Sequence, residues 1–274
     1  MLTHPHCKIN VGLHVVARRP DGYHDLETLF VPVPLCDDLE IEPNDTFHFQ
    51  QSGIAIAGPT DDNLCVRAWR LLQQRFPQVG NVRIRLHKRV PFGAGLGGGS
   101  SDAAFTLRML NALFQLGLSR DDLLPLASQL GADCPFFLFD TPAYATGIGD
   151  RLEPLACRLE GCRVVLLKPT DSVSTAEAYR RVVPRAVRPD TTPCDLRQVV
   201  QMPVAAWRDV VVNDFEASVF PTHPTIAHLK SQLYAAGALY ASMSGSGSAV
   251  FGLFPEEASV VLPPLPPDTF VWGV

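Results

Sequence analysis

A glycine-rich segment is the part of the sequence best suited to chemistry. Residues 91–102 read Pro-Phe-Gly-Ala-Gly-Leu-Gly-Gly-Gly-Ser-Ser-Asp, with five glycines in the seven positions 93–99. Glycine is entropically costly to order, and a tight turn needs only one or two. Several glycines together let consecutive backbone N–H groups approach an anion, and the helix predicted over 103–114 adds its positive N-terminal dipole. We therefore predict a phosphate-binding loop rather than a merely structural one.

Better-known nucleotide motifs match this segment only in part. Gly93, Gly95 and Gly98 have the spacing of the dinucleotide fingerprint, but the preceding strand alternates apolar residues with Arg83 and Arg85. That fingerprint requires a fully buried strand and an acid about 20 residues further on, where this sequence predicts a helix. The segment lacks the Gly-Lys-Ser/Thr of a P-loop, and the chain lacks the His-Arg-Asp of protein kinases.

Several other polar residues have both a structural and a functional interpretation. Lys8 lies in an apolar, β-rich segment, 8–17, where an edge-strand lysine can lay its stem on apolar surface. Asp133 follows a predicted helix end and suits a turn or cap. Tyr23 and His24 follow a Pro-Asp-Gly turn, so we expect both side chains to be displayed, although a loop tyrosine can also cover a core edge.

Two further positions stay open between two roles. Asn63 precedes a predicted helix over 64–76 and suits either helix capping or a ligand contact. Gly245 and Ser246 lie in a second Gly/Ser segment, 242–248, which fits a plain turn or a close backbone approach to an anion.

The predicted elements mix strands and helices, which indicates the α+β class. Strands are expected at 8–17, 27–33, 82–86, 164–167 and 249–254, and helices at 64–76, 103–114, 119–130 and 225–236. Pro32 and Pro34 place the second strand at a sheet edge, because proline cannot donate to a ladder. Residues 184–203 are expected to be irregular, and the proline-rich tail is expected at the surface.

Composition excludes several classes of protein. The 274 residues are 46% apolar and carry a net charge of −5, which argues against a disordered chain and against binding of nucleic acid. Seven scattered cysteines without a Cys-x-x-Cys pair fit neither a disulfide framework nor a zinc ribbon. No apolar run approaches the roughly 18 residues of a membrane span, so we expect a cytoplasmic protein without a membrane partner. The sequence leaves monomer and homodimer open.

Four segments resemble the GHMP kinases, the family of galactokinase and of the homoserine, mevalonate and phosphomevalonate kinases. They are 7–10 (Cys-Lys-Ile-Asn), 18–24 (Arg-Arg-Pro-Asp-Gly-Tyr-His), the glycine loop and 131–137 (Gly-Ala-Asp-Cys-Pro-Phe-Phe), with weaker support from 147–149 and 242–247. Segment 18–24 resembles the branch that phosphorylates an alcohol carrying cytidine diphosphate in isoprenoid biosynthesis. The resemblance spans nearly the whole chain.

This resemblance implies a two-domain GHMP kinase fold. The N-terminal domain, ribosomal protein S5 domain 2-like, would cover 1–153, and a ferredoxin-like C-terminal domain would cover 154–274. ATP is the implied cofactor, together with Mg²⁺, for which Ser100 or Ser101 is a candidate ligand.

The resemblance also assigns roles to single residues. Lys8 and Asp133 would be the catalytic pair. ATP would be bound by Asn63 and by the loop residues Pro91, Phe92, Gly93, Ala94, Gly95, Leu96, Gly97, Gly98, Gly99, Ser100 and Ser101. The small-molecule substrate would be bound by Asn10, Tyr23, His24, Tyr179, Gly245 and Ser246. Among these, Tyr23 and Tyr179 would stack on the cytosine and His24 would bond its edge.

Two alternatives remain at this point. One is another small-alcohol GHMP kinase, of the homoserine or mevalonate type, whose substrates lack a cytosine and leave Tyr23 and His24 without a role. The other is a non-catalytic nucleotide-binding regulator, against which the presence of both Lys8 and Asp133 argues.

Overall fold

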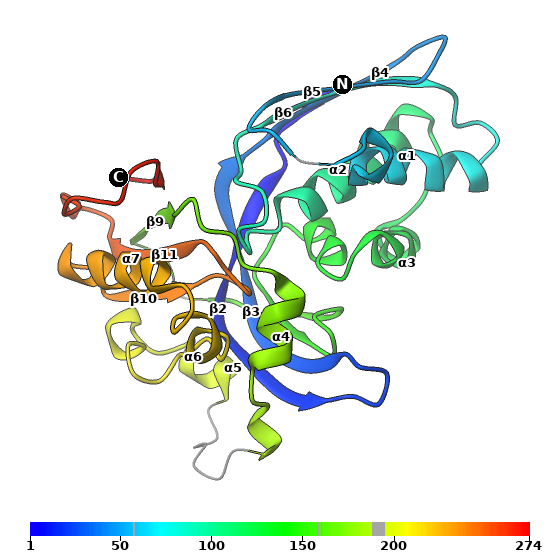
Figure 1. Ribbon diagram of the computed structural model, residues 1–274. Helices are drawn as coiled ribbons and strands as arrows, with labels where there is room; N and C mark the ends of the chain where they lie inside the picture. Colours follow the sequence, from blue (N-terminus) through cyan, green and yellow to red (C-terminus); the bar gives the residue numbers. More distant parts are fainter. Residues whose placement is uncertain (57, 158, 160, 188–194) are drawn as a thin grey trace. The chain divides into compact units, whose positions relative to one another are not determined.

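The computed structural model describes residues 1–56, 58–157, 159, 161–187 and 195–274 (Figure 1). The chain forms two compact units, each assembled from separate stretches. Unit 1 comprises Met1–Lys8, Pro32–Phe92 and Gly97–Asp140, and unit 2 comprises Ile9–Val31, Gly93–Leu96 and Thr141–Val274. The units group residues that pack together, whereas the predicted domains 1–153 and 154–274 are continuous segments of the chain. The domain boundary near residue 153 stays a prediction.

Unit 1 is built on a four-stranded sheet in the order β1-β4-β6-β5. β4 pairs antiparallel with β1 and β6, whereas β5 runs parallel to β6. The strands are β1 (Leu2–Thr3), β4 (Asp38–Pro43), β5 (His48–Gly53) and β6 (Val82–Lys88). The alternation that predicted β6 is confirmed. Sequence reasoning missed β5 because this edge strand is largely exposed and reads His-Phe-Gln-Gln-Ser-Gly, without an apolar face.

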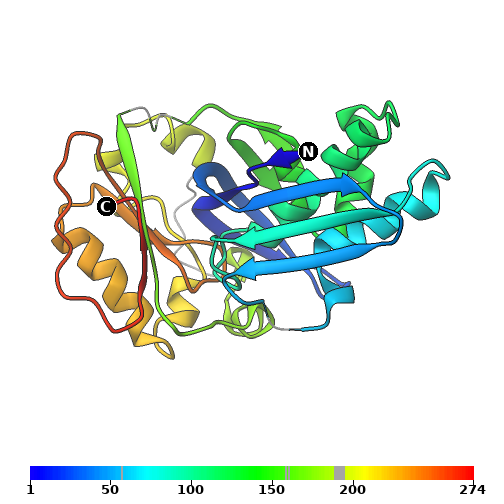
Figure 2. The ribbon, with the colours of Figure 1, turned by 90° about the horizontal axis from the view of Figure 1, so that it is seen from above.

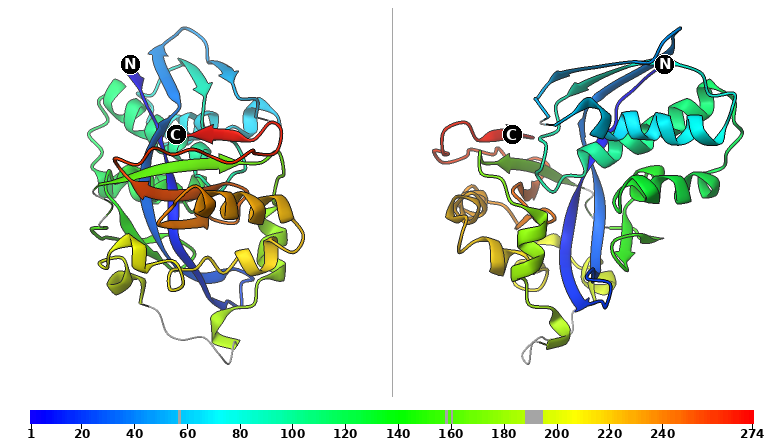
Figure 3. Two further views of the ribbon diagram at one scale, coloured as in Figure 1. Left: turned by 90° about the vertical axis from the view of Figure 1, so that its left-hand side faces the viewer. Right: turned by 45° about the vertical axis from the view of Figure 1, so that its right-hand side comes forward.

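Three helices cover one face of this sheet (Figures 2 and 3). They are α1 (Leu64–Arg75), α2 (Gly98–Leu113) and α3 (Arg120–Leu130). The predicted caps are confirmed, since Asn63 accepts from the Cys65 N–H and Ser119 forms a reciprocal capping box with Asp122. The predicted start of α2 at residue 103 is wrong by five residues. Gly98 to Asp102 form its first turns, although glycine and serine are weak helix formers.

Unit 2 contains a second sheet, in the order β2-β3-β7-β8. Its strands are β2 (His6–Arg18), β3 (His24–Cys36), β7 (Ala143–Thr146) and β8 (Arg151–Pro154), and the first residues of β2 and the last of β3 belong to unit 1. The edge position predicted for β3 is wrong, because β3 lies between β2 and β7. Within β3, Thr28–Phe30 pair with β7, so Pro32 and Pro34 lie past the end of this pairing and interrupt none of its hydrogen bonds.

A third sheet, in the order β10-β11-β9-β12, completes unit 2, and every strand pair in it is antiparallel. Its strands are β9 (Cys162–Lys168), β10 (Tyr240–Met243), β11 (Val250–Pro255) and β12 (Phe270–Trp272). Helix α7 (Pro224–Ala235) packs on β10 and β11 (Figure 3). The tail is partly incorporated in the sheet, because β12 pairs with β9, which the proline-rich sequence did not reveal.

Short helices fill the remainder of the described chain. They are α4 (Thr175–Arg181), α5 (Leu196–Val199) and α6 (Glu216–Val219), with 3-10 helices at Thr60–Asp62, Cys134–Leu138, Arg185–Val187 and Val204–Ala206. The core of unit 2 gathers apolar side chains from β2, β9, β11, α7 and the segment around Phe215. The mixture of sheets and helices confirms the α+β class. Among the described residues, none of the helices has both the length and the apolar character needed to span a bilayer.

Candidate active site

The glycine loop owes its shape to backbone conformations that favour glycine. Gly93, Gly95 and Gly97 have φ values of +63°, +75° and +69°, in the left-handed region that other residues rarely adopt. Gly97 is the N-cap of α2, and Gly98 and Gly99 are its first two residues. The loop therefore leads into a helix whose first N–H groups lack intrahelical acceptors, which is the arrangement that binds phosphate.

The two predicted catalytic residues meet in unit 1. β2 supplies Lys8, and Asp133 lies between the end of α3 and the 3-10 helix Cys134–Leu138. Lys8 Nζ and Asp133 Oδ2 are 3.4 Å apart, and the side chains are 3% and 35% exposed, respectively. One partner is thus buried and fixed, while the carboxylate is open to another molecule.

The Lys8 side chain also lies beside the start of α2. A Cβ atom added to Gly97 would approach Lys8 Cε to 3.1 Å and Phe137 Cζ to 2.8 Å. Only glycine fits here, on grounds of both φ and space. An ammonium group and a helix N-terminus therefore lie close together, and both favour a negatively charged ligand.

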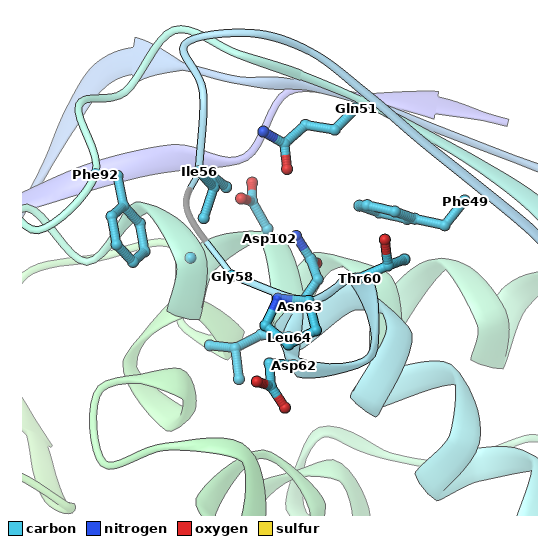
Figure 4. Close-up of a pocket in the computed structure, with 12 residues that line it drawn as sticks. Phe49, Gln51, Ile56, Gly58, Thr60, Asp62, Asn63, Leu64, Phe92 and Asp102 are labelled. Carbon is cyan, nitrogen blue, oxygen red and sulfur yellow. The ribbon is translucent and has the colours of Figure 1, made fainter.

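A pocket of about 400 Å³ opens beside the first turn of α2 (Figure 4). Residues of β5, Ile56, residues between 58 and 64, Phe92 and the start of α2 line it. Of the predicted ATP residues, Asn63, Phe92 and Gly99 are part of this lining. The Asn63 side chain caps α1, so the capping role is shown and the nucleotide contact stays a prediction.

A buried ionic cluster of unit 1 escaped the sequence analysis. Lys88 Nζ donates to the carboxylates of Asp37 and Asp102, the latter at 2.7 Å, and all three side chains are buried. Asp37 also accepts from the backbone N–H groups of Arg89 and Val90, at 2.6 and 2.8 Å. The cluster thus joins the end of β6, where the loop begins, to the first turns of α2. Its only sequence signal is a lysine at an inward-facing position of β6.

The environment shifts the protonation of this cluster. Burial lowers the pKa of Lys88, but the attraction of Asp102 and Asp37 outweighs it, so the pKa is raised overall. Burial raises the pKa of Asp102 to about 7, although Lys88 acts in the opposite direction. Asp102 Oδ1 forms no hydrogen bond within the part of the chain that the structure describes.

Unit 2 brings together two of the predicted substrate residues. The His24 and Tyr179 rings stack with centroids 5.1 Å apart and an interplanar angle of 27°. Tyr23 is 62% exposed, as expected, but His24 is only 9% exposed, so the prediction that it is displayed is wrong. The stacking on Tyr179 buries it. Burial, followed by the nearby Arg18, lowers the pKa of His24, which favours the neutral imidazole.

The second Gly/Ser segment packs backbone against backbone on the glycine loop, within unit 2. Ser244 Oγ donates to Gly95 O at 2.9 Å, and the Ala249 N–H donates to Ala94 O at 3.0 Å. A Cβ at Gly95 would lie 2.0 Å from Ser244 O, so glycine is required there. The Asn10 N–H donates to Ser244 Oγ at 3.3 Å. Predicted residues of two separate motifs are therefore neighbours.

The remaining predicted substrate residues lie in the same part of unit 2. Asn10 is buried and its amide donates to Thr28 Oγ1 at 3.0 Å. A Cβ at Gly245 would be 3.5 Å from Asn10 Oδ1. Ser246 Oγ lies 3.0 Å from Thr175 Oγ1, at the start of α4. Asn10, Gly245 and Ser246 thus form a polar group around this loop.

The potential metal ligands are sparse. No group of three or more His, Cys, Asp or Glu side chains that could hold a metal ion occurs among the described residues. Ser101 Oγ, in the first turns of α2, is buried and has no hydrogen-bond partner within the described ranges. This donor set fits a Mg²⁺ ion that takes most of its ligands from phosphate and water.

Two parts of the sequence match models of one protein family. Residues 63–141 match the family described as GHMP kinases N terminal domain, and residues 202–262 match GHMP kinases C terminal. The first match contains the α1 cap, the glycine loop and Asp133; the second contains the 242–247 segment. The chain belongs to the GHMP kinases. Their two-domain fold, expected from the sequence, is confirmed.

Relatives with closely similar sequences share one name. A 4-diphosphocytidyl-2-C-methyl-D-erythritol kinase of Parabacteroides distasonis is 47% identical over 272 residues, covering 99% of this chain and 98% of the relative. A protein of the same name from Bacteroides thetaiotaomicron is 47% identical over 264 residues, covering 95% and 94%.

The chain is also similar to solved structures, one of which is named as the same kinase as these relatives. A crystal structure of 4-(cytidine 5'-diphospho)-2C-methyl-D-erythritol kinase has a TM-score of 0.78 at 39% identity and covers 92% of this chain and 90% of its own. The Methanococcus jannaschii mevalonate kinase has a TM-score of 0.68 at 12% identity, covering 94% and 91%, which shows a shared fold alone.

Proposed function

We propose that this protein transfers the γ-phosphoryl group of ATP to the 2-hydroxyl of 4-diphosphocytidyl-2-C-methyl-D-erythritol, a step of non-mevalonate isoprenoid biosynthesis in the cytoplasm. The observation that carries the proposal is the Lys8–Asp133 pair beside the N-terminus of α2, in a chain whose close relatives bear this kinase's name. A non-catalytic nucleotide-binding protein has no need for an open carboxylate held by a buried lysine.

The pair suggests how the acceptor hydroxyl reacts. An alcohol is a far weaker acid than a carboxylic acid, so full proton transfer from the hydroxyl to a carboxylate before attack is strongly unfavourable. Asp133 therefore orients the hydroxyl and takes its proton late, while the new P–O bond forms and the bond to the β-phosphate breaks. A loose phosphoryl-transfer transition state needs little prior ionisation of the nucleophile. ADP leaves, and Asp133 passes its proton to water.

The remaining groups act by position and charge. Lys8 pairs with the Asp133 carboxylate and faces developing negative charge, and the N–H groups at the start of α2 bind the ATP phosphates. Asn63, Phe92 and Gly99 contact the nucleotide in the pocket that they line. Ser101 Oγ, a buried hydroxyl with no hydrogen-bond partner among the described residues, would be the protein ligand of a Mg²⁺ ion, which would neutralise part of the charge of the ATP phosphates.

The substrate residues of unit 2 recognise the cytidine diphosphate. Exposed Tyr23 provides one stacking face for the cytosine. Tyr179 provides the other, and neutral His24 hydrogen-bonds the base edge, once the His24–Tyr179 stack opens. Asn10 contacts the alcohol portion or its diphosphate, and Gly245 and Ser246 contact the diphosphate.

A coupled ADP-release assay tests the proposal with a small set of acceptors. We expect turnover with ATP and 4-diphosphocytidyl-2-C-methyl-D-erythritol, and none above background with homoserine or mevalonate, which lack the cytosine. Phosphorus NMR of the product places the new phosphate on the alcohol. ATP binding without turnover of any acceptor would instead support a regulatory protein, and turnover of homoserine or mevalonate alone would support another small-alcohol kinase.

A further inference from the structure

The turn that contains Asn213 contributes some of the most buried polar groups of unit 2, and no role has been assigned to it. The Asp214 N–H donates to Leu13 O at 2.8 Å, and the Asp214 carboxylate accepts from the Val15 N–H at 2.8 Å. Arg185 holds the same carboxylate through two hydrogen bonds, of 2.8 and 3.0 Å. The turn is therefore fixed against the side of β2.

From this fixed turn, the Asn213 side chain reaches the 242–248 segment. Its Nδ2 donates to Met243 O and to Gly245 O, both at 2.8 Å, while its Oδ1 accepts from the Phe215 N–H at 3.0 Å. Asn213 is 2% exposed. Because both amide hydrogens and the oxygen are engaged, the side chain has one preferred orientation. Asn213 thus fixes the direction of two loop carbonyls.

A second side chain of the same turn holds the base of the loop. Glu216 Oε1 accepts from the Met243 N–H at 2.8 Å and from Ser242 Oγ at 3.1 Å, and Lys230 pairs with the other carboxylate oxygen at 2.6 Å. Both side chains contact the base of the loop at Met243, and Asn213 is the one that also reaches its glycine end, at Gly245 O.

The direction of a carbonyl determines the direction of the next N–H group. In a trans peptide the C=O of one residue and the N–H of the next point to opposite sides. Gly245 O faces Asn213, so the Ser246 N–H points away from Asn213. Within the described residues the Ser246 N–H donates to no acceptor, whereas the Ser244 N–H donates to Ala249 O at 2.9 Å. A donor is thus oriented without an internal acceptor.

We infer that Asn213 is a positioning residue, which turns the 245–246 peptide so that the Ser246 N–H binds the diphosphate of the substrate. The inference rests on the proposed function, because it assigns the substrate's anion to this loop. A backbone N–H directed at a phosphate oxygen makes a charge-assisted hydrogen bond, whereas a carbonyl turned the other way repels the same anion. Gly245, with φ of +56°, leaves the peptide free to rotate once Asn213 is lost.

Asn213→Asp is the variant that tests the two amide hydrogen bonds most directly. It has the same shape and keeps the acceptor for the Phe215 N–H, but a carboxyl group has at most one proton to offer to the two carbonyls. Asn213→Ala, the second variant, removes both donors. Trp207→Phe is the matched control, because it removes a buried donor to Met202 O in the same unit and does not touch the loop.

The binding measurements compare cytidine 5'-diphosphate with cytidine by calorimetry. For both Asn213 variants we expect the affinity for cytidine 5'-diphosphate to fall about tenfold, the usual scale for a lost buried donor. Cytidine should bind within about twofold of wild type, because it has no diphosphate for the Ser246 N–H to bind. Trp207→Phe should bind both ligands as wild type does. Equal losses for the two ligands, or none, would overturn the inference.

Amide hydrogen exchange provides a readout that needs no ligand. Peptides covering 243–247 should exchange faster in both Asn213 variants than in wild type or Trp207→Phe, and unchanged exchange would show that Asn213 does not fix the loop. If the wild-type protein binds neither cytidine compound and phosphorylates no cytidine-containing alcohol, the proposed function and the role of Ser246 fail together. Hydrogen exchange then still decides whether Asn213 orients the loop.

Discussion

Unit 1 contains two lysine–aspartate groups near the start of α2, and they are built in opposite ways. Lys8 and Asp133 are 3.4 Å apart, with the carboxylate 35% exposed. Lys88 is enclosed by Asp37 and Asp102, all three are buried, and Asp37 also accepts two backbone N–H groups. One group leaves a carboxylate open to a reactant, and the other forms its hydrogen bonds inside the protein, with Asp102 Oδ1 the exception among the described atoms.

The difference in exposure distinguishes a charged group that can react with a substrate from charged groups that stabilise the fold. A catalytic carboxylate has to exchange protein and solvent partners for substrate, so it needs exposure and a fixed counter-charge. A buried ionic cluster stabilises only when its members satisfy one another, and removal of one member leaves an uncompensated charge in the interior. Sequence spacing does not distinguish the two cases, because each places a lysine on a strand and an aspartate near a helix end.

Asp133→Asn and Lys8→Ala should show the largest effect, and it should fall on catalysis. We expect kcat to drop by about 10²- to 10⁴-fold, the usual contribution of a positioned proton acceptor. Asn keeps the shape of a partly exposed side chain, so the melting temperature of Asp133→Asn should stay close to that of wild type. Steady-state kinetics with ATP and the cytidine substrate, together with thermal unfolding, check both statements. Near-normal turnover in both variants would remove the catalytic assignment.

Lys88→Met should show the reverse pattern. It leaves the carboxylates of Asp37 and Asp102 facing each other without their cation, and breaking a buried ion pair costs about 3–5 kcal/mol of unfolding free energy. Urea denaturation measures this loss. Lys8→Met is the matched control, because its partner Asp133 can be solvated, and we expect it to lose less than half as much stability. Equal losses in the two variants would contradict the distinction between the two groups.

The structure brings several residues of the predicted site together, whereas parts of the supporting structure were not predicted. The glycine loop, Lys8 and Asp133 belong to motifs in which residue type and order carry the signal, and the structure places Lys8 beside Asp133 and Gly97. The α1 and α3 caps were also predictable, because a cap is a local hydrogen bond. These features depend on neighbours in the sequence or on a resemblance, and neither needs knowledge of tertiary packing.

The missed features depend on contacts between residues far apart in the sequence. Asp37 and Lys88 are 51 positions apart, and Asn213 and Gly245 are 32 apart, so no local pattern marks them. His24 was expected at the surface because it follows a turn, but stacking on Tyr179 buries it. β5 lacks an apolar face, and the prolines of β3 lie past the end of β7, so rules for strands and edges did not apply there.

The last effect expected is a change in the pH dependence of stability through Asp102. Burial raises its pKa from 3.8 to about 7, so between those values the folded chain binds more protons than the unfolded chain, and stability falls as pH rises through this window. Asp102→Asn cannot titrate. The stability of wild type relative to this variant should therefore decrease from about pH 4 to about pH 7 and be constant above that range.

Urea unfolding of both proteins across this pH range measures the difference, in which the other titrating groups cancel. Asp122→Asn is the control, because hydrogen bonds from the Ser119 side chain and backbone lower the pKa of exposed Asp122, so its contribution is lost only as pH falls below the usual range. Parallel stability curves for wild type and Asp102→Asn between about pH 4 and pH 7 would mean that Asp102 stays ionised there. Lys88 would then compensate fully for the burial of the Asp102 carboxylate.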